Sequence, residues 1–283
     1  MIKKEQSNYG VTMMSEVLEV SRSSFYAWLR RPVSQLEKEN AYLTERIRVI
    51  HAQSKQRYGS PRITAELRDT GFKCGKNRVA KLMKRQGISA RARKRFKRTT
   101  NSNHKLPVAS NLVGMQFNPE KKNSLWATDI TYIRTREGWL YLSVMLDLYS
   151  RAVISWNVDK YMDENLVMRT LEKAIRDRKP NDELILHSDR GSQYASLKLR
   201  NMMKENNIQQ SMSSKGNCYD NAPVESFFST LKRELVYRTS YKTREEARQS
   251  LFEFIELFYN RKRRHSTLNY VSPFQFENNQ KHA

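Results

Sequence analysis

The sequence has very little cysteine and no long apolar run. Its two cysteines, Cys74 and Cys218, lie far apart without neighbouring metal-ligand pairs, and its five histidines are scattered. This spacing argues against a zinc finger and against a disulfide framework. No apolar segment follows Met1 or is long enough to span a bilayer, so we expect a cytoplasmic protein without a membrane partner.

Acidic residues are scarce relative to basic ones. The 283 residues include 52 Lys and Arg against 29 Asp and Glu, a formal net charge of +23. Residues 1–107 carry 25 basic and 8 acidic side chains, so +17 of that charge lies in the N-terminal part. A polyanionic partner is expected, because cationic side chains that neutralise phosphates release condensed counterions. Anionic membrane surfaces attract the same charge, so charge alone does not decide between the two.

The N-terminal part has helical periodicity. Residues 12–31 predict two short helices, residues 38–53 predict another, and residues 58–87 predict a helix-turn-helix. The last helix, at about 76–86, has an apolar stripe and a polar face shaped for a DNA major groove. The residues of that face expected to contact DNA are Lys76, Asn77, Arg78, Lys81, Lys84 and Arg85. A solvated basic face on a small helical domain is the alternative.

Basic residues also cluster at two places outside this helix. One cluster opens a polar, proline-containing stretch that extends to about residue 118, which indicates a linker or an arm that follows DNA. The other cluster follows the last amphipathic helix. The candidate DNA contacts in these clusters are Arg91, Arg93, Lys94, Arg95, Arg261, Arg263 and Arg264.

The pattern changes to strands from residue 124. Three strands separated by short connections indicate an antiparallel meander, and strands and helices then alternate. The predicted strands are 124–133, 139–149, 152–158, 184–189 and 208–212, and the predicted helices are 164–178, 196–206, 222–237 and 244–260. Up to residue 237 this order is typical of ribonuclease-H-like α/β folds, in which helices flank a mixed sheet.

These changes of pattern divide the chain into five segments. We expect an N-terminal helical segment with a helix-turn-helix at 1–55 and a helix-turn-helix DNA-binding domain at 56–90. A basic linker at 91–118 precedes a ribonuclease-H-like catalytic core at 119–240. A C-terminal helix and basic tail complete the chain at 241–283.

Three carboxylates stand in separate elements of the predicted core. Asp129 lies within an apolar strand, Asp189 ends another strand, and Glu225 lies in the first turn of a helix, 35 residues after Asp189. Singly, each has an ordinary explanation as a salt-bridge partner, a turn residue or a helix-dipole partner. Together they are hard oxygen ligands suited to Mg²⁺ or Mn²⁺, and Lys232 shares the helix face of Glu225.

Two further residues lie close to these strand ends. His187 shares strand parity with Asp189, and we expect it to lie beside the metal ligands or to face DNA rather than to bind a metal. Asp147 lies near the end of another strand, where a structural pairing with a nearby arginine is expected.

Several sequence blocks closely resemble bacterial insertion-sequence transposases of the group related to retroviral integrases (the insertion-sequence-three family, second-reading-frame product). The blocks are WATDITY at 126–132, HSDRGSQY at 187–194, GNCYDNAPVESFF at 216–228, YNR at 259–261 and RHSTL at 264–268. The resemblance covers nearly the whole chain and implies an integrase core with a ribonuclease-H-like fold.

The resemblance also implies a site and a reaction. Asp129, Asp189 and Glu225 would hold two Mg²⁺ or Mn²⁺ ions, and Lys232 would hold a phosphate near the scissile bond. Hydrolysis at an element end would expose a 3′-hydroxyl that attacks another phosphodiester. The implied partners are terminal inverted repeats and target DNA, a homo-oligomer on DNA associated with the nucleoid, and an upstream-frame product as partner or fusion. A repressor without enzymatic activity and a ribonuclease-H-type nuclease or junction resolvase are the alternatives.

Overall fold

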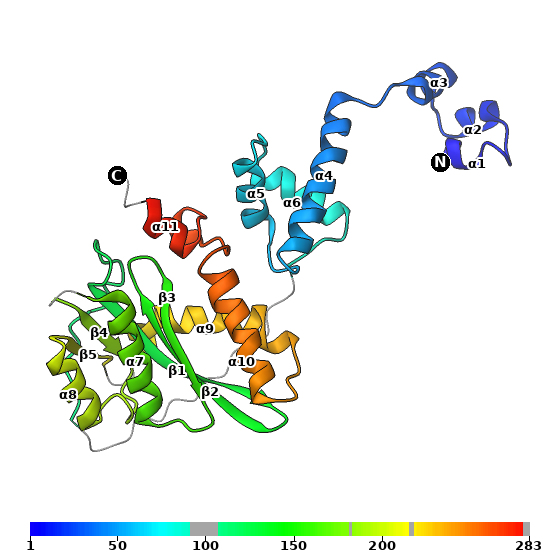
Figure 1. Ribbon diagram of the computed structural model, residues 1–283. Helices are drawn as coiled ribbons and strands as arrows, with labels where there is room; N and C mark the ends of the chain where they lie inside the picture. Colours follow the sequence, from blue (N-terminus) through cyan, green and yellow to red (C-terminus); the bar gives the residue numbers. More distant parts are fainter. Residues whose placement is uncertain (91–106, 181–182, 215–217, 280–283) are drawn as a thin grey trace. The chain divides into compact units, whose positions relative to one another are not determined.

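The protein forms two compact units, Met1–Arg91 and Ala92–Ala283. A computed structural model describes residues 1–90, 107–180, 183–214 and 218–279 of the chain (Figure 1). The predicted basic contacts Arg91, Arg93, Lys94 and Arg95 lie outside the described residues.

The first unit is helical where it is described. Its helices are α1 (Ile2–Glu5), α2 (Val11–Val17), α3 (Arg22–Arg30), α4 (Gln35–Gln53), α5 (Ser60–Asp69) and α6 (Lys76–Arg85). Helix α4 begins at a capping box, in which the Ser34 hydroxyl accepts from the Glu37 amide and the Glu37 carboxylate accepts from the Ser34 amide. Helices α4, α5 and α6 contact one another and bury Ile63, Leu67 and Val79.

The second unit contains a five-stranded mixed sheet in the order β3-β2-β1-β4-β5. Its strands are β1 (Leu125–Thr135), β2 (Gly138–Asp147), β3 (Ala152–Asp159), β4 (Ile185–Ser188) and β5 (Gln209–Met212). Strands β1, β2 and β3 form the predicted antiparallel meander, and β4 and β5 add in parallel. The predicted fold class, a mixed sheet flanked by helices after a helical region, is confirmed.

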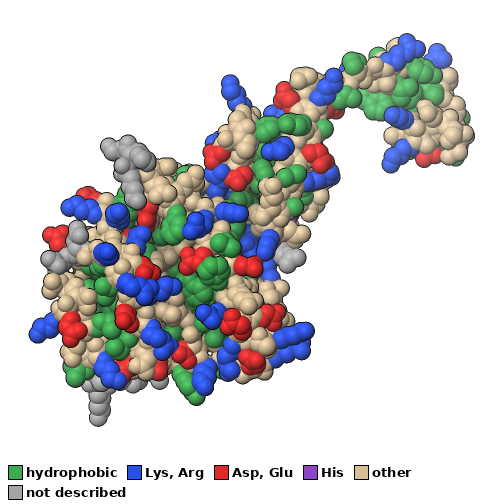
Figure 2. All heavy atoms as spheres, viewed as in Figure 1, with side chains coloured by type: hydrophobic (Ala, Val, Ile, Leu, Met, Phe, Trp, Pro, Cys, Tyr) green, Lys and Arg blue, Asp and Glu red, His purple; other side chains and the backbone are tan. Residues whose placement is uncertain are grey.

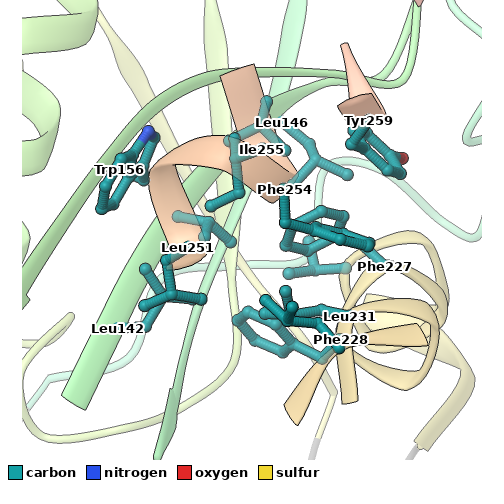
Figure 3. Packing of buried hydrophobic residues seen from close by; sticks show 14 of the residues in the cluster. Leu142, Leu146, Trp156, Phe227, Phe228, Leu231, Leu251, Phe254, Ile255 and Tyr259 are labelled. Carbon is teal, nitrogen blue, oxygen red and sulfur yellow. The ribbon is translucent and has the colours of Figure 1, made fainter. Parts of the chain in front are cut away.

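Helices cover both faces of this sheet (Figure 1). The remaining elements are α7 (Glu164–Arg178), α8 (Leu197–Glu205), η1 (Cys218–Asn221), α9 (Ala222–Glu234), η2 (Val236–Arg238), α10 (Arg244–Phe252), η3 (Glu253–Tyr259), η4 (Ser266–Leu268) and α11 (Pro273–Asn279). Side chains of β1 alternate between the faces, so Trp126 packs with α7 and α8, whereas Leu125 and Ala127 share a core with α9 and α10. In that second core Phe227 and Leu231 of α9 lie against the sheet and Phe254 (Figure 3).

The predicted helix at 244–260 changes its geometry partway along. Helix α10 is α-helical, and η3 continues it as a π-helix up to Tyr259. Directly after η3, the Asn260 side chain pairs with Val153 of the edge strand β3. Its Nδ2 donates to the Val153 carbonyl (2.8 Å), and its Oδ1 accepts from the Val153 amide (3.0 Å). These two bonds occupy main-chain groups that an edge strand would otherwise leave unpaired.

Part of the predicted linker packs on the sheet. Val113 is buried in the core shared with α9 and α10, and the Leu112 amide donates to Ser211 Oγ of β5 (2.9 Å). Residues 107–118 therefore belong structurally to the second unit, because their apolar and polar groups find partners there.

Asp147 is fully buried at the end of β2 and is paired as predicted. Its carboxylate accepts from Arg178 Nη2 of α7 (2.9 Å) and from the amides of Asn123 and Tyr149 (3.0 Å each). Arg178 also binds Glu277 of α11 through two hydrogen bonds (2.7 and 2.9 Å). One guanidinium thus joins a strand end, a helix end and the C-terminal helix.

Replacing Arg178 with Met is expected to destabilise the chain by about 3 kcal/mol, because it leaves the buried Asp147 carboxylate without its counter-charge. Urea denaturation would measure the change. Arg176→Met is the matched control: Arg176 lies on the same helix but is 70% exposed, and its pairing with Asp177 is expected to contribute at most about 1 kcal/mol. Equal effects of the two substitutions would contradict this assignment.

Candidate active site

The register of two parallel strands brings Asp129 and Asp189 together. Strand β1 pairs with β4 only over four residues, ending with Thr128 opposite Ser188. The next residue of each chain segment is an aspartate, so both carboxylates stand at the same end of adjacent strands. Beyond Thr128, β1 continues without β4 beside it, which leaves this edge of the sheet open next to the two acids. Both aspartates are half-buried.

The turn after Asp189 brings the main chain of Gly191 close to two side-chain oxygens. The Gly191 amide donates to Asp189 Oδ1 (2.9 Å). A Cβ atom on Gly191 would lie 3.1 Å from that same oxygen and 2.8 Å from Gln193 Oε1. Gly191 therefore permits a close approach of main chain to carboxylate, which fixes the orientation of Asp189.

Glu225 is brought to the site by the position of α9. It lies exposed in the first turn of this helix, which packs against β1. His187 of β4 holds the turn before the helix: its Nε2 bonds the Asp220 main-chain carbonyl (2.8 Å) and its Nδ1 bonds Ser211 Oγ (2.9 Å). The Asp220 carboxylate in turn accepts from the Ser214 amide (2.6 Å).

His187 is a neutral, buried support in this arrangement. Burial lowers its pKa, although the hydrogen bond to the Asp220 carbonyl opposes that effect. A carbonyl can only accept, so Nε2 carries the proton and Nδ1 accepts from the Ser211 hydroxyl. Both ring nitrogens are thereby occupied away from the carboxylates. This position agrees with an expected role beside the metal ligands, which we retain as a proposal.

Lys232 lies on the second turn of α9 after Glu225. It is 4% exposed, and its Nζ lies 4.7 Å from the centroid of the Tyr132 ring on β1. Burial lowers its pKa, and the negative charge of Asp129 opposes that effect. The site therefore contains one buried cation close to its acids.

The neighbouring acids raise the proton affinity of Asp129. Burial is the main cause that raises the pKa of Asp129 well above its usual range, and the charges of Asp189 and Glu225 add to it. The hydrogen bond from the Ile130 amide (2.7 Å) and the charge of Lys232 act in the opposite direction. The hydrogen bond and the positive charge that the protein provides therefore do not offset the unfavourable free energy of ionising Asp129 at this position.

Tyr194 is a residue of this site that the sequence analysis did not single out. It is buried, and its burial together with the charges of Asp129 and Asp189 raises its pKa well above the usual range. The phenol therefore stays neutral behind the two acids. Its place in the block HSDRGSQY was the only signal available from the sequence.

The donor set suits a hard divalent cation. Three carboxylates from separate elements, with an excess of negative charge around Asp129, match the oxygen ligands that Mg²⁺ and Mn²⁺ prefer. Among the described residues, no group of three His, Cys, Asp or Glu side chains stands positioned to hold a metal ion. The three acids are thus neighbours, but in the side-chain conformations of the structure their carboxylates do not point to one common metal position.

The predicted DNA-contacting face of α6 is mostly open. Lys76, Asn77, Lys81, Lys84 and Arg85 are exposed on it. Arg78 differs, because its guanidinium donates to Asn40 (2.9 Å) and Glu39 (3.1 Å) of α4. Arg78 therefore holds α6 to α4 within the first unit.

The C-terminal basic cluster, like the α6 face, contains both exposed basic residues and at least one arginine bound to another part of the same unit. Arg261 is exposed and lies over the Phe274 ring, and Arg264 donates to the Tyr270 carbonyl (2.9 Å). Arg263 is 4% exposed and binds the Glu234 carboxylate at the end of α9 through Nη2 (2.8 Å) and Nε (3.0 Å). We assign Arg263 a structural role, because its guanidinium faces the interior and is occupied.

Charge on the visible surface is dispersed. Figure 2 shows Lys and Arg side chains spread over both units and interspersed with Asp and Glu, without one continuous basic face on the side in view. No helix in the described part of the chain is long and apolar enough to cross a membrane.

Comparison with known proteins identifies the family. Residues 37–96 match the HTH-like domain, and residues 119–218 and 206–273 match two models named Integrase core domain. The chain is 42% identical over 279 residues to the Transposase InsF for insertion sequence IS3A of Escherichia coli (strain K12), covering 98% of this chain and 97% of that protein. It is 41% identical over 263 residues to the Insertion element IS600 uncharacterized 31 kDa protein of Shigella sonnei, covering 93% and 97%.

A solved structure is similar at lower identity. The HTLV-2 integrase catalytic core domain in complex with magnesium aligns with a TM-score of 0.43 and 16% identity, covering 54% of this chain and 95% of that one. The near-complete match to curated transposases is the stronger finding, since it spans both the helical unit and the sheet. The chain belongs to the family of IS3-type insertion-sequence transposases.

Proposed function

We propose that the chain binds the ends of an insertion element and performs metal-dependent cleavage and joining of DNA strands. The observation that carries this proposal is the alignment of Asp129 with Asp189 at the ends of paired parallel strands. Glu225 and Lys232 on α9 complete the set, since the charges of both act on Asp129. Membership of a transposase family supports DNA as the substrate.

The three carboxylates would hold two Mg²⁺ or Mn²⁺ ions, and the chemistry that these ions would supply is activation of the attacking oxygen and stabilisation of the leaving one. Lys232 would bind a phosphate oxygen beside the scissile bond. In the first step water attacks the phosphodiester at the element end, the bond from phosphorus to the 3′ oxygen breaks, and a 3′-hydroxyl is released. In the second step that hydroxyl attacks a target phosphodiester: its oxygen forms a new bond to the target phosphorus, and the bond from that phosphorus to the 3′ oxygen of the target strand breaks, which frees a target 3′-hydroxyl. Neither step needs a covalent bond to the protein.

The first unit would select the DNA. Helix α6 exposes four cations and an amide that can enter a major groove, while Arg78 fixes the helix to α4. An element has two ends, so a homo-oligomer on DNA, or an assembly with an upstream-frame product, belongs to the same proposal. The exposed residues in question are Lys76, Asn77, Lys81, Lys84 and Arg85.

Replacing Asp189 with Asn is expected to lower cleavage and joining of labelled element-end DNA by about a thousandfold or more, because a metal ligand is lost. Chelation of Mg²⁺ should have the same effect on the parent chain, whereas DNA binding should persist in both cases. Asp177→Asn on the surface of α7 is the control and should retain activity. Unchanged cleavage by the Asp189 variant would overturn the carboxylate assignment, and cleavage without joining would favour a nuclease.

Replacing Asp129 with Asn is expected to raise the Tm of the metal-free chain at pH 7, by about 2–4 °C for each kcal/mol regained. A carboxyl whose pKa is raised by folding destabilises the fold above its unfolded pKa of about 3.9, and the difference should vanish below that pH. Mg²⁺ should raise the Tm of the parent more than that of the variant. Thermal melts of the parent and the variant at pH 3 and at pH 7 test this prediction. A variant whose Tm equals that of the parent at pH 7 as well as at pH 3 would contradict it.

Replacing Lys81 or Lys84 with Ala is expected to weaken binding to all DNA sequences and to reduce the slope of log K against log salt by about 1 each. Each exposed ammonium would otherwise neutralise one phosphate. Binding isotherms at several salt concentrations measure the slope. Lys38→Ala, on the exposed surface of α4, is the matched control. A slope as large as the parent's in the α6 variants would exclude this helix from the DNA interface.

A further inference from the structure

A groove of about 730 Å³ lies next to Lys232 in the second unit. One wall comes from the hairpin of β1 and β2, and the other comes from the end of α9 and the connection to α10. The side chains that concern us here are Tyr132, Arg134, Arg136, Trp139, Lys232 and Tyr237. Because Lys232 belongs both to this groove and to the surroundings of Asp129, the groove extends away from the candidate active site.

The two walls are fixed to each other by main-chain contacts. Thr135 forms a parallel bridge with Tyr241, and the Arg136 amide donates to the Tyr241 carbonyl (3.1 Å). At the start of α10, Arg244 Nε donates to the Trp139 carbonyl (3.0 Å). The hairpin and α10 lie side by side in Figure 1. The groove is therefore preformed, because hydrogen bonds fix the main-chain segments that carry its aromatic side chains.

Two large aromatic side chains of the groove remain open to solvent. Trp139 is 46% exposed and Tyr237 is 44% exposed. The Tyr132 ring packs edge-on against Trp139 at 5.2 Å, which supports one side of the indole. Exposed aromatic rings in a basic groove are typical of surfaces on which the bases of a single strand stack. A paired duplex keeps its bases stacked on one another and cannot use such rings in this way.

The charge of the groove matches a nucleic-acid backbone. Arg134 and Arg136 are exposed, and neither forms an ion pair with any residue that the structure describes. Of the described side chains that line the groove, none is acidic. Two open guanidinium groups flanking aromatic rings provide alternating sites for phosphates and bases.

We propose that this groove binds unpaired nucleotides adjoining the scissile phosphate, with bases stacked on Trp139 and Tyr237 and phosphates at Arg134 and Arg136. The proposal rests on the proposed function, since it places the scissile phosphate at Lys232. It adds that the strand leaves the active site as a single strand along the hairpin. The substrate preferred by the full chain is therefore an element end whose base pairs are opened next to the cleavage point.

The test compares two substrates in binding to the full chain, measured by fluorescence anisotropy without divalent ions. One is a fully paired element-end duplex, and the other carries a short mismatched stretch beside the scissile phosphate. Trp139→Ala should weaken binding to the mismatched substrate by about tenfold and leave the paired one nearly unchanged. Trp139→Phe should keep most of the preference, because it retains an aromatic ring. Phe252→Ala, which removes a 49% exposed ring outside the groove, is the control.

Each outcome decides the proposal. The fluorescence of a 2-aminopurine base in the mismatched stretch should be quenched on binding to the parent but not on binding to the Trp139→Ala variant. The Tm of this variant should match that of the parent, which shows that the variant is folded. Equal loss of affinity for both substrates would assign Trp139 to duplex binding and overturn the proposal, as would no loss. A cleavage assay in Mg²⁺ distinguishes failure of the groove proposal from failure of the proposed function. If the parent cleaves DNA but Trp139→Ala binds both substrates like the parent, only the groove proposal is refuted. If Trp139→Ala weakens binding to the mismatched substrate but the parent does not cleave DNA, only the proposed chemistry is refuted.

Discussion

The short parallel pairing of β1 with β4 is the constraint on which the candidate site depends. Four aligned residue pairs end at Thr128 and Ser188, so the register alone determines that Asp129 and Asp189 are neighbours. Shifting the register by one residue would separate them and would turn the side chains of β4 to the wrong faces of the sheet. Two like charges at a strand end are unfavourable by themselves, and the apolar cores on both faces of the sheet maintain the pairing that forces them together.

Helix α9 carries the other half of the site and is held along its whole length. His187 bonds the turn before it, Glu234 at its end binds Arg263, and Phe227 lies in the core between them. Glu225 and Lys232 therefore occupy fixed positions on one rigid element whose supports all belong to the second unit. Arg263 and the neutral His187 both bind groups that hold α9, so these polar residues support the geometry of the candidate site.

Much of the fold was predictable because its determinants are local. The change to strand-like patterning after residue 124 predicted all five strands, and an isolated acid in an apolar strand identified Asp129 as unusual. The predicted pairing of Asp147 with an arginine is also confirmed. What the sequence did not indicate depends on tertiary partners: Arg78 binds α4, Arg263 turns inward to Glu234, and residues 107–118 pack on the sheet. A count of basic residues cannot distinguish a guanidinium that faces solvent from one that another helix occupies.

The π-helical segment η3 makes the C-terminal part of the chain sensitive to length rather than to composition. A π-helical turn holds more residues than the 3.6 of an α-helical turn, so each residue after it is rotated relative to a continuous α-helix. That rotation places Asn260 against β3 and Arg263 against Glu234. Removing one residue between Glu253 and Tyr259 would let the helix relax to the common form and would turn both side chains away. A substitution that keeps the chain length leaves this rotation in place, whereas a deletion of one residue removes it.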